Sequence, residues 1–413
     1  MFKICLNPDI AIHFRNTINE YINFSMNHKY KHKNKKIDNS WNTICSIMDR
    51  IDDLVYYLNK KVLNDGTWKS CAFDFFEFIE QAGVLISCID DAFAIYNVKY
   101  QSHNVIFKSM RLNPKVPIKK NKCELDDSYF MYIRSLSSVH PSDTSHHKEF
   151  QEADFEVSPY VMWNGGALAL NNKNVDLVLV SYNNETSDFI INKGVIISEI
   201  FNYIKYKYYS LNYLSKKISL YYKRIISDFR LSKIKKVSSF KDYILYLKQL
   251  KDESSKRNPD MEYEIQEIID IFSLELTNKK NEIKFMKYKN SLKYAMQSFH
   301  RQLQNMDFNC ISPFDRLIGD LLLGEIYLKD ANYRYPLGKI IYLKESNGEK
   351  KFGLGMYRCL LNVFERYVEV SEEDLSKLSY YELYVLSQIA LYFHALEYDN
   401  NISKLIPNQI EYR

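Results

Sequence analysis

Apolar residues recur at intervals of three and four along most of this chain, and this spacing constrains its fold more than any other feature. Residues 41–58 are the clearest case, because the apolar positions there follow one side of a 3.6-residue period. These positions are Trp41, Ile44, Ile47, Met48, Ile51, Leu54, Val55 and Leu58. Glycine and proline disfavour helices, and the 413 residues include only 11 glycines and 9 prolines. The pattern predicts a mainly α-helical fold and argues against a turn-rich all-β fold.

β-like segments interrupt the helical pattern near residues 153–183. Residues 155–163 and 175–182 are rich in β-branched and aromatic side chains, and a turn sequence with Gly165 and Gly166 separates them. We therefore expect a small β-hairpin or three-stranded meander inserted into a helical bundle. Residues 70–98 are the most apolar segment, which is typical of a helix at the centre of a bundle.

The length exceeds that of one typical domain, so two domains are expected. We predict a helical domain with the β insertion at 1–232 and a C-terminal helical domain at 233–413, because the apolar pattern breaks within 230–258. A long helix is predicted from residue 191 to 229. In the second domain we expect a helix over 313–329 and a loop over 337–355.

Charge and cysteine content exclude several classes of protein. The net charge of +5 is compatible with a nucleic-acid partner but does not require one. The seven cysteines include no C-x-x-C pair, so neither a disulfide framework nor a structural zinc site is expected, and we predict no metal and no cofactor. We find no apolar run of the roughly 20 residues that cross a bilayer and no signal-peptide pattern at the N-terminus. A cytoplasmic location without a membrane partner is the expectation.

One arginine and one histidine have a spacing that suits phosphodiester chemistry. Arg134 is followed by Ser135 and, six residues on, by His140, which precedes Pro141. A guanidinium offers a planar fork of donors to phosphate oxygens, and an imidazole can accept or give a proton near neutral pH. Because a residue before proline is pushed out of the α region, His140 should mark a helix end and be able to turn toward Arg134.

This motif resembles that of the HEPN superfamily, in which an arginine, four to six residues and a histidine lie on a helix of a multi-helix domain. Many members are metal-independent endoribonucleases of toxin–antitoxin, abortive-infection and CRISPR-linked antiviral defence. The resemblance implies a homodimer that cleaves RNA by 2′-hydroxyl attack, with an antitoxin or other regulatory protein as a further partner. It implies Arg134 and His140 as catalytic residues, with Ser135 orienting the arginine or the phosphate. Asp143 and Thr144 follow directly and are expected to support the site.

A simpler interpretation of the same residues stays open. Arg134 would bind a carboxylate, and His140 would be a helix-terminal residue stabilised by the helix dipole. The protein would then be a non-catalytic helical module that binds RNA or a partner protein.

A basic and aromatic segment is the strongest candidate for RNA contact. Its cations alternate with tyrosines, which suits a surface that follows a phosphate backbone while rings stack on bases. The cations are Lys205, Lys207, Lys216, Lys217, Lys223 and Arg224. The alternative is a helix that packs its rings inward and leaves its ammonium groups in water.

Overall fold

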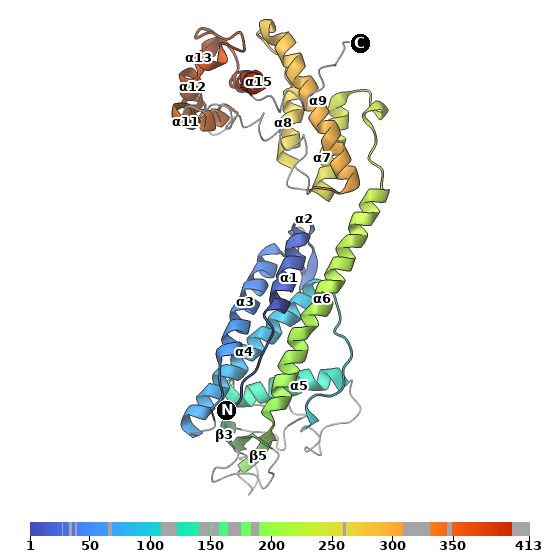
Figure 1. Cartoon of the computed structure of the whole chain (residues 1–413), viewed down its shortest axis with the longest axis vertical. Helices are drawn as coiled ribbons and strands as arrows, with labels where there is room; N and C mark the ends of the chain where they lie inside the picture. The colour runs from blue at the N-terminus through green and yellow to red at the C-terminus, as the bar shows by residue number, and fades with distance from the viewer. Residues whose placement is uncertain are drawn as a thin grey trace. The chain divides into compact units, whose positions relative to one another are not determined.

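The computed structural model describes residues 1–26, 28–32, 35–37, 39–64, 68–108, 122–139, 150, 157–163, 175–182, 190–258, 262–308, 331–344 and 349–398. The chain is mainly helical, with a small antiparallel sheet, as predicted (Figure 1). It divides into two compact units, unit 1 (residues 1–223) and unit 2 (residues 224–413). The division falls inside a continuous helix, nine residues before the boundary that the sequence suggested.

Unit 1 is built around long helices that run beside one another (Figure 1). The helices of unit 1 are α1 (Asp9–Glu20), α2 (Ile22–Ser25), α3 (Trp41–Lys60), α4 (Trp68–Ile95), α5 (Lys122–Arg134) and α6 (Ile197–Leu231). A short hairpin of β1 (Tyr30–His32) and β2 (Lys35–Ile37) lies between α2 and α3. Helix α3 packs against both α1 and α4, and the hydroxyl of Tyr208 on α6 accepts the backbone N–H of Ala11 on α1.

The buried face of α3 is the one that the apolar spacing predicted. All of the predicted apolar positions from Ile44 to Leu58 are buried, whereas Trp41 is half-buried at the first turn. Helix α4 departs from the predicted position at the centre of a bundle only in its early part, where Phe73 is 73% exposed. The next turns of α4, including Phe78, Leu85 and Ile89, lie in the core.

The inserted sheet has three antiparallel strands in the order β3 (Val157–Trp163), β4 (Leu177–Tyr182) and β5 (Ile190–Val195). Residues 177–180 of the central strand β4 are all buried, which explains why this strand is a continuous apolar run rather than an alternating one. The predicted insertion was too short at its C-terminal end, because β5 occupies residues where we expected a helix to start. The conformation of such a short segment depends on its pairing with β4 more than on the intrinsic strand propensity of its residues.

Unit 2 is a second helical body with its own core. Its helices are α7 (Tyr243–Arg257), α8 (Glu262–Ser273), α9 (Glu282–Asn305), α11 (Ala331–Lys339), α12 (Lys350–Cys359), α13 (Leu361–Phe364), α14 (Asp374–Lys377) and α15 (Tyr380–Tyr398). The predicted loop over 337–355 is wrong for much of its length, because α11 continues to Lys339 despite Pro336 and is followed by a 3₁₀ turn at Ile340–Leu343. The helix predicted over 313–329 lies outside the described residues.

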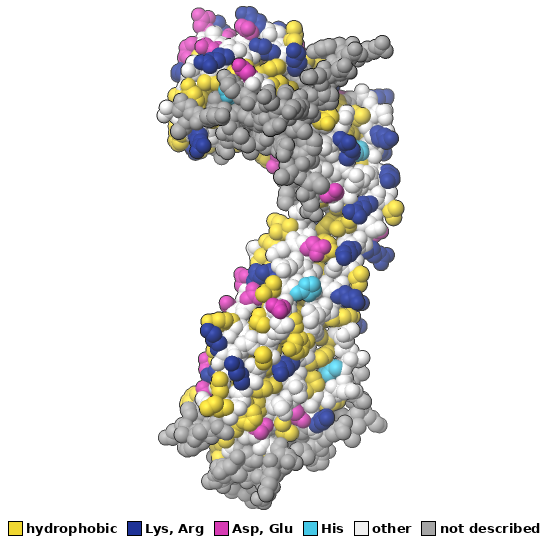
Figure 2. All heavy atoms as spheres, in the orientation of Figure 1, with side chains coloured by type: hydrophobic (Ala, Val, Ile, Leu, Met, Phe, Trp, Pro, Cys, Tyr) yellow, Lys and Arg dark blue, Asp and Glu magenta, His cyan; other side chains and the backbone are white. Residues whose placement is uncertain are grey.

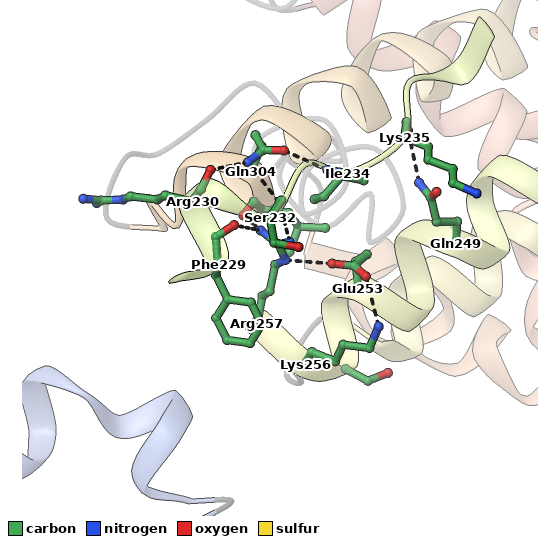
Figure 3. Close-up of polar contacts among 12 residues, drawn as sticks. Phe229, Arg230, Ser232, Ile234, Lys235, Gln249, Glu253, Lys256, Arg257 and Gln304 are labelled. Carbon is green, nitrogen blue, oxygen red and sulfur yellow. Dashed lines mark hydrogen bonds and ion pairs between the residues drawn. The ribbon is translucent and has the colours of Figure 1, made fainter. Parts of the chain in front are cut away.

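A buried arginine holds together the helix ends on one side of unit 2 (Figure 3). Arg257, the last residue of α7, is 1% exposed. Its Nη1 donates to the carbonyls of Phe229 at 2.8 Å and Leu303 at 3.2 Å, and its Nη2 donates to that of Ser232 at 3.0 Å. Its Nε donates to Glu253 at 2.9 Å. Carbonyls at helix C-termini lack partners within the helix, so this one guanidinium caps the ends of both α6 and α9.

Candidate functional site

Arg134 lies at the C-terminal end of α5 and is held by a carboxylate of α4. Its Nη2 donates to Glu80 Oε2 at 2.7 Å, and its Nε lies 3.2 Å from each Glu80 oxygen. Both side chains are partly exposed, Arg134 at 21% and Glu80 at 29%. The guanidinium is therefore fixed by a charge-assisted, forked contact while part of it reaches the surface.

Helix α4 also provides the space that the arginine occupies. Gly83 lies one turn after Glu80, and a Cβ atom built on it would be 2.8 Å from Nε of Arg134 and 2.9 Å from its Cδ. Such a distance is too short for real atoms, so any larger residue at position 83 would require the arginine side chain to move from its place against α4. Neither Glu80 nor Gly83 could be identified from the sequence, because about fifty residues of chain separate each of them from Arg134.

The helix changes form directly after Arg134. Residues Ser135–Val139 form a π-helical turn, where the sequence predicted a continuous α-helix as far as His140. The hydroxyl of Ser135 donates to the carbonyl of Tyr132 at 2.8 Å, and that of Ser137 donates to Ile133 at 2.7 Å. Ser135 is buried, so its hydroxyl is directed into the helix and not toward a phosphate.

The predicted catalytic histidine and the two predicted supporting residues are not part of the described structure. His140, Asp143 and Thr144 lie outside the described residues. The structure thus places one half of the Arg–His pair, with the carboxylate partner that the simpler interpretation of Arg134 expected.

Lys207 does not belong to the exposed basic segment, which corrects its predicted role in RNA contact. It is 1% exposed, and its Nζ lies 3.0 Å from both Asp90 and Asp127. The ammonium also lies 4.1 Å from the ring centroid of Tyr100. A group enclosed in this way cannot meet a phosphate. The helical phase contained a signal for this burial, because Lys207 is a multiple of about 3.6 residues from Ile200, Leu211, Leu214 and Ile218, which are buried.

Two tyrosines complete the surroundings of Lys207. Tyr100 donates its hydroxyl to Asp90, and Tyr203 donates to Asp127. Burial raises the pKa of both hydroxyls, and the two nearby carboxylates raise it further. Both tyrosines therefore stay protonated as donors, and this network joins α4, α5 and α6 as a structural centre of unit 1.

The other predicted cations share the opposite side of α6. Lys216, Lys217, Lys223 and Arg224 are exposed, and Lys205 is half-buried. At about 100° per residue, these positions fall within roughly 120° of one another around the helix. Two tyrosines and a leucine lie on the same side. We call this set the outer face of α6, and it consists of Lys205, Tyr209, Tyr213, Lys216, Lys217, Leu220, Lys223 and Arg224.

The charged residues on the outer face are all positive. Helix α6 contains no aspartate or glutamate between Glu199 and Asp228, so no acidic residue of the helix itself offsets these cations. Figure 2 shows Lys and Arg side chains following the exposed side of α6. Such a run of cations is the electrostatic footprint expected for a polyanion.

Comparison with known proteins identifies no relative: no family model, no curated protein and no solved structure matches the chain. Across the described ranges, no helix combines the length and apolar character that crossing a bilayer needs. In that same part of the chain, no group of three or more His, Cys, Asp or Glu side chains is placed to hold a metal ion.

Proposed function

We propose that this protein binds RNA through the outer face of α6. The observation that supports the proposal is the exposed row of lysines on a helix without acidic residues between positions 199 and 228. Phosphate contacts release counterions from the nucleic acid, so cations on one accessible surface provide affinity without any reading of base sequence. The buried side of α6, with Ile204, Tyr208 and Leu211 in the core, keeps these cations directed outward.

The test measures the salt dependence of RNA binding by the full chain. Lys216, Lys217 and Lys223 are replaced together by glutamine, which keeps a helix-compatible side chain but removes three charges. Each phosphate contact contributes about 0.7 to the slope of log K against log salt for a single strand, so the slope should decrease by about 2.

A matched control removes the same charge elsewhere on unit 1. Lys3, Lys60 and Lys99 are also exposed, and none of them lies on α6. Their replacement by glutamine should leave the salt slope nearly unchanged. Equal losses from both triple variants would mean that net charge alone governs binding, and the outer face would then not be the interface.

Metal-independent cleavage of RNA at Arg134 and His140 is a second candidate function. It is favoured by the position of a partly exposed, carboxylate-held guanidinium at the start of a π-helical turn, since such turns occur frequently at functional sites. Arg134 would offset charge on the phosphorus, and His140 would act as general acid or base, supported by Asp143 and Thr144. Ser135 is left out of this proposal, because its hydroxyl is bonded to the backbone. A homodimer, an antitoxin partner and a cytoplasmic role in defence accompany this proposal through the HEPN resemblance.

The cleavage proposal is tested with His140→Ala and Arg134→Lys in the presence of a metal chelator. Replacing His140 leaves the Arg134–Glu80 pair intact, and lysine keeps a positive charge beside Glu80, so neither change removes the ion pair outright. Both variants should lose RNA cleavage while their unfolding midpoints and RNA affinity stay close to those of the wild type. If cleavage survives in both variants, or if the wild type does not cleave RNA, only the RNA-binding proposal remains.

A further inference from the structure

Two rows of cations border a stripe of aromatic and apolar side chains on the outer face of α6. With about 100° per residue, Lys205, Lys216 and Lys223 form one row, and Lys217 and Arg224 form the other. Tyr209, Tyr213 and Leu220 lie between the rows. This arrangement places aromatic side chains between the cations, where a nucleic acid backbone held by those cations would bring its bases.

Two of the three side chains in the stripe are exposed to a ligand. Tyr209 is 42% exposed and Leu220 is 54% exposed, whereas Tyr213 is half-buried beneath the Lys217 ammonium, which lies 5.2 Å from its ring centroid. Along the helix, Tyr209 and Tyr213 are about 6 Å apart. Rings and cations on one patch are the combination that binds unpaired bases together with their phosphates.

We infer that the outer face takes single-stranded rather than double-stranded RNA, with unpaired bases lying against Tyr209 and Tyr213. The inference rests on the proposed RNA binding and adds the class of substrate. In a duplex the base faces are covered by their neighbours, so the tyrosine rings would have nothing to stack on. Helix α6 cannot enter a groove instead, because its other side is buried in unit 1 and the major groove of an RNA duplex is too deep and narrow for side chains to read.

The test compares Tyr209→Leu/Tyr213→Leu with the wild-type chain. The probes are a fluorescent oligouridine of about 12 nucleotides, an RNA duplex of similar length, and immobilised heparin, which has charge but no bases. The wild type should bind oligouridine more tightly than the duplex. The double variant should lose about fivefold or more in oligouridine affinity for each ring, with unchanged heparin retention.

Tyr56→Leu is the matched control. Tyr56 is 63% exposed on α3, and the Lys60 ammonium lies over its ring at 4.0 Å, so it reproduces the ring-and-cation pair away from α6. This variant should bind all three probes like the wild type.

Equal affinity of the wild type for duplex and single strand, or unchanged oligouridine binding by the tyrosine variant, would overturn the inference. RNA binding itself would still stand in that case if the lysine triple variant lost salt-dependent affinity. If that triple variant bound oligouridine and heparin like the wild type, the proposed interface and the inference would both fail.

Discussion

Replacing Arg257 by methionine should strongly destabilise unit 2. Methionine keeps the apolar stem but removes the guanidinium that donates to the three carbonyls and to Glu253 (Figure 3). Removing the guanidinium takes its donor away from three carbonyls, and each buried acceptor left without a partner costs about 1 to 3 kcal/mol. The bonds share one charged group, so their separate contributions are not summed. We expect the free energy of unfolding of unit 2 to decrease by about 4 kcal/mol in total. Stabilities of natural domains are about 5 to 15 kcal/mol, so unit 2 should become marginally stable.

The chain provides its own reporter for this experiment. All three tryptophans, Trp41, Trp68 and Trp163, belong to unit 1. Tryptophan fluorescence therefore follows the unfolding of unit 1, whereas far-ultraviolet circular dichroism follows the helices of both units. With a slope of about 2 kcal/mol per molar urea, Arg257→Met should move the dichroism transition of unit 2 down by about 2 M. The fluorescence transition should move little.

Lys256→Met is the control for this prediction. Lys256 contacts the same carboxylate, Glu253, at 3.0 Å, but its side chain is 58% exposed, and such surface pairs contribute less than about 1 kcal/mol. An Arg257→Met protein with an unchanged dichroism midpoint would refute the reasoning. A fluorescence shift as large as the dichroism shift would equally refute it, because the damage would then not be confined to unit 2.

Two further predictions concern unit 1. Burial lowers the pKa of His28 below its ordinary value of 6.5, so the unfolded chain binds this proton more strongly than the folded chain. The free energy of unfolding should therefore decrease as the pH falls through 6.5. In urea titrations at about pH 8 and about pH 5, His28→Gln should lose less stability between the two pH values than the wild type does. Gly83→Ala should displace the Arg134 guanidinium from Glu80, because the new Cβ would lie 2.8 Å from Nε. In thermal unfolding it should lower the free energy of unfolding by up to about 1 kcal/mol, the contribution of a partly exposed ion pair. Gly338→Ala, which meets nothing within 4 Å, should instead be neutral or slightly stabilising, and similar losses from both changes would contradict the steric argument.

The helices of this protein could be predicted from the sequence where a local period repeats over several turns. The buried face of α3 is the best example, since its spacing identified the same positions that the core contains. The strand β4 was found for a similar reason, as its run of apolar residues is continuous. Strand β5 was missed because six residues carry too little pattern, and its conformation depends on a partner strand.

The candidate sites depended much more on contacts between distant residues. That α6 is a cationic helix without acidic residues over most of its length can be read from the amino-acid order, because composition and helical period are both local properties. The packing of α6 against α4 and α5 was needed to show that Lys207 is enclosed by Asp90 and Asp127 while Lys216 and Lys223 face outward.

The same distinction applies to Arg134. Its charge and its place at a helix end follow from the chain, but its partner Glu80 and the gap at Gly83 come from another helix. A charged side chain takes the partner that the packing of whole helices brings within about 3 Å, and the spacing of residues along a single helix contains no information about that distance.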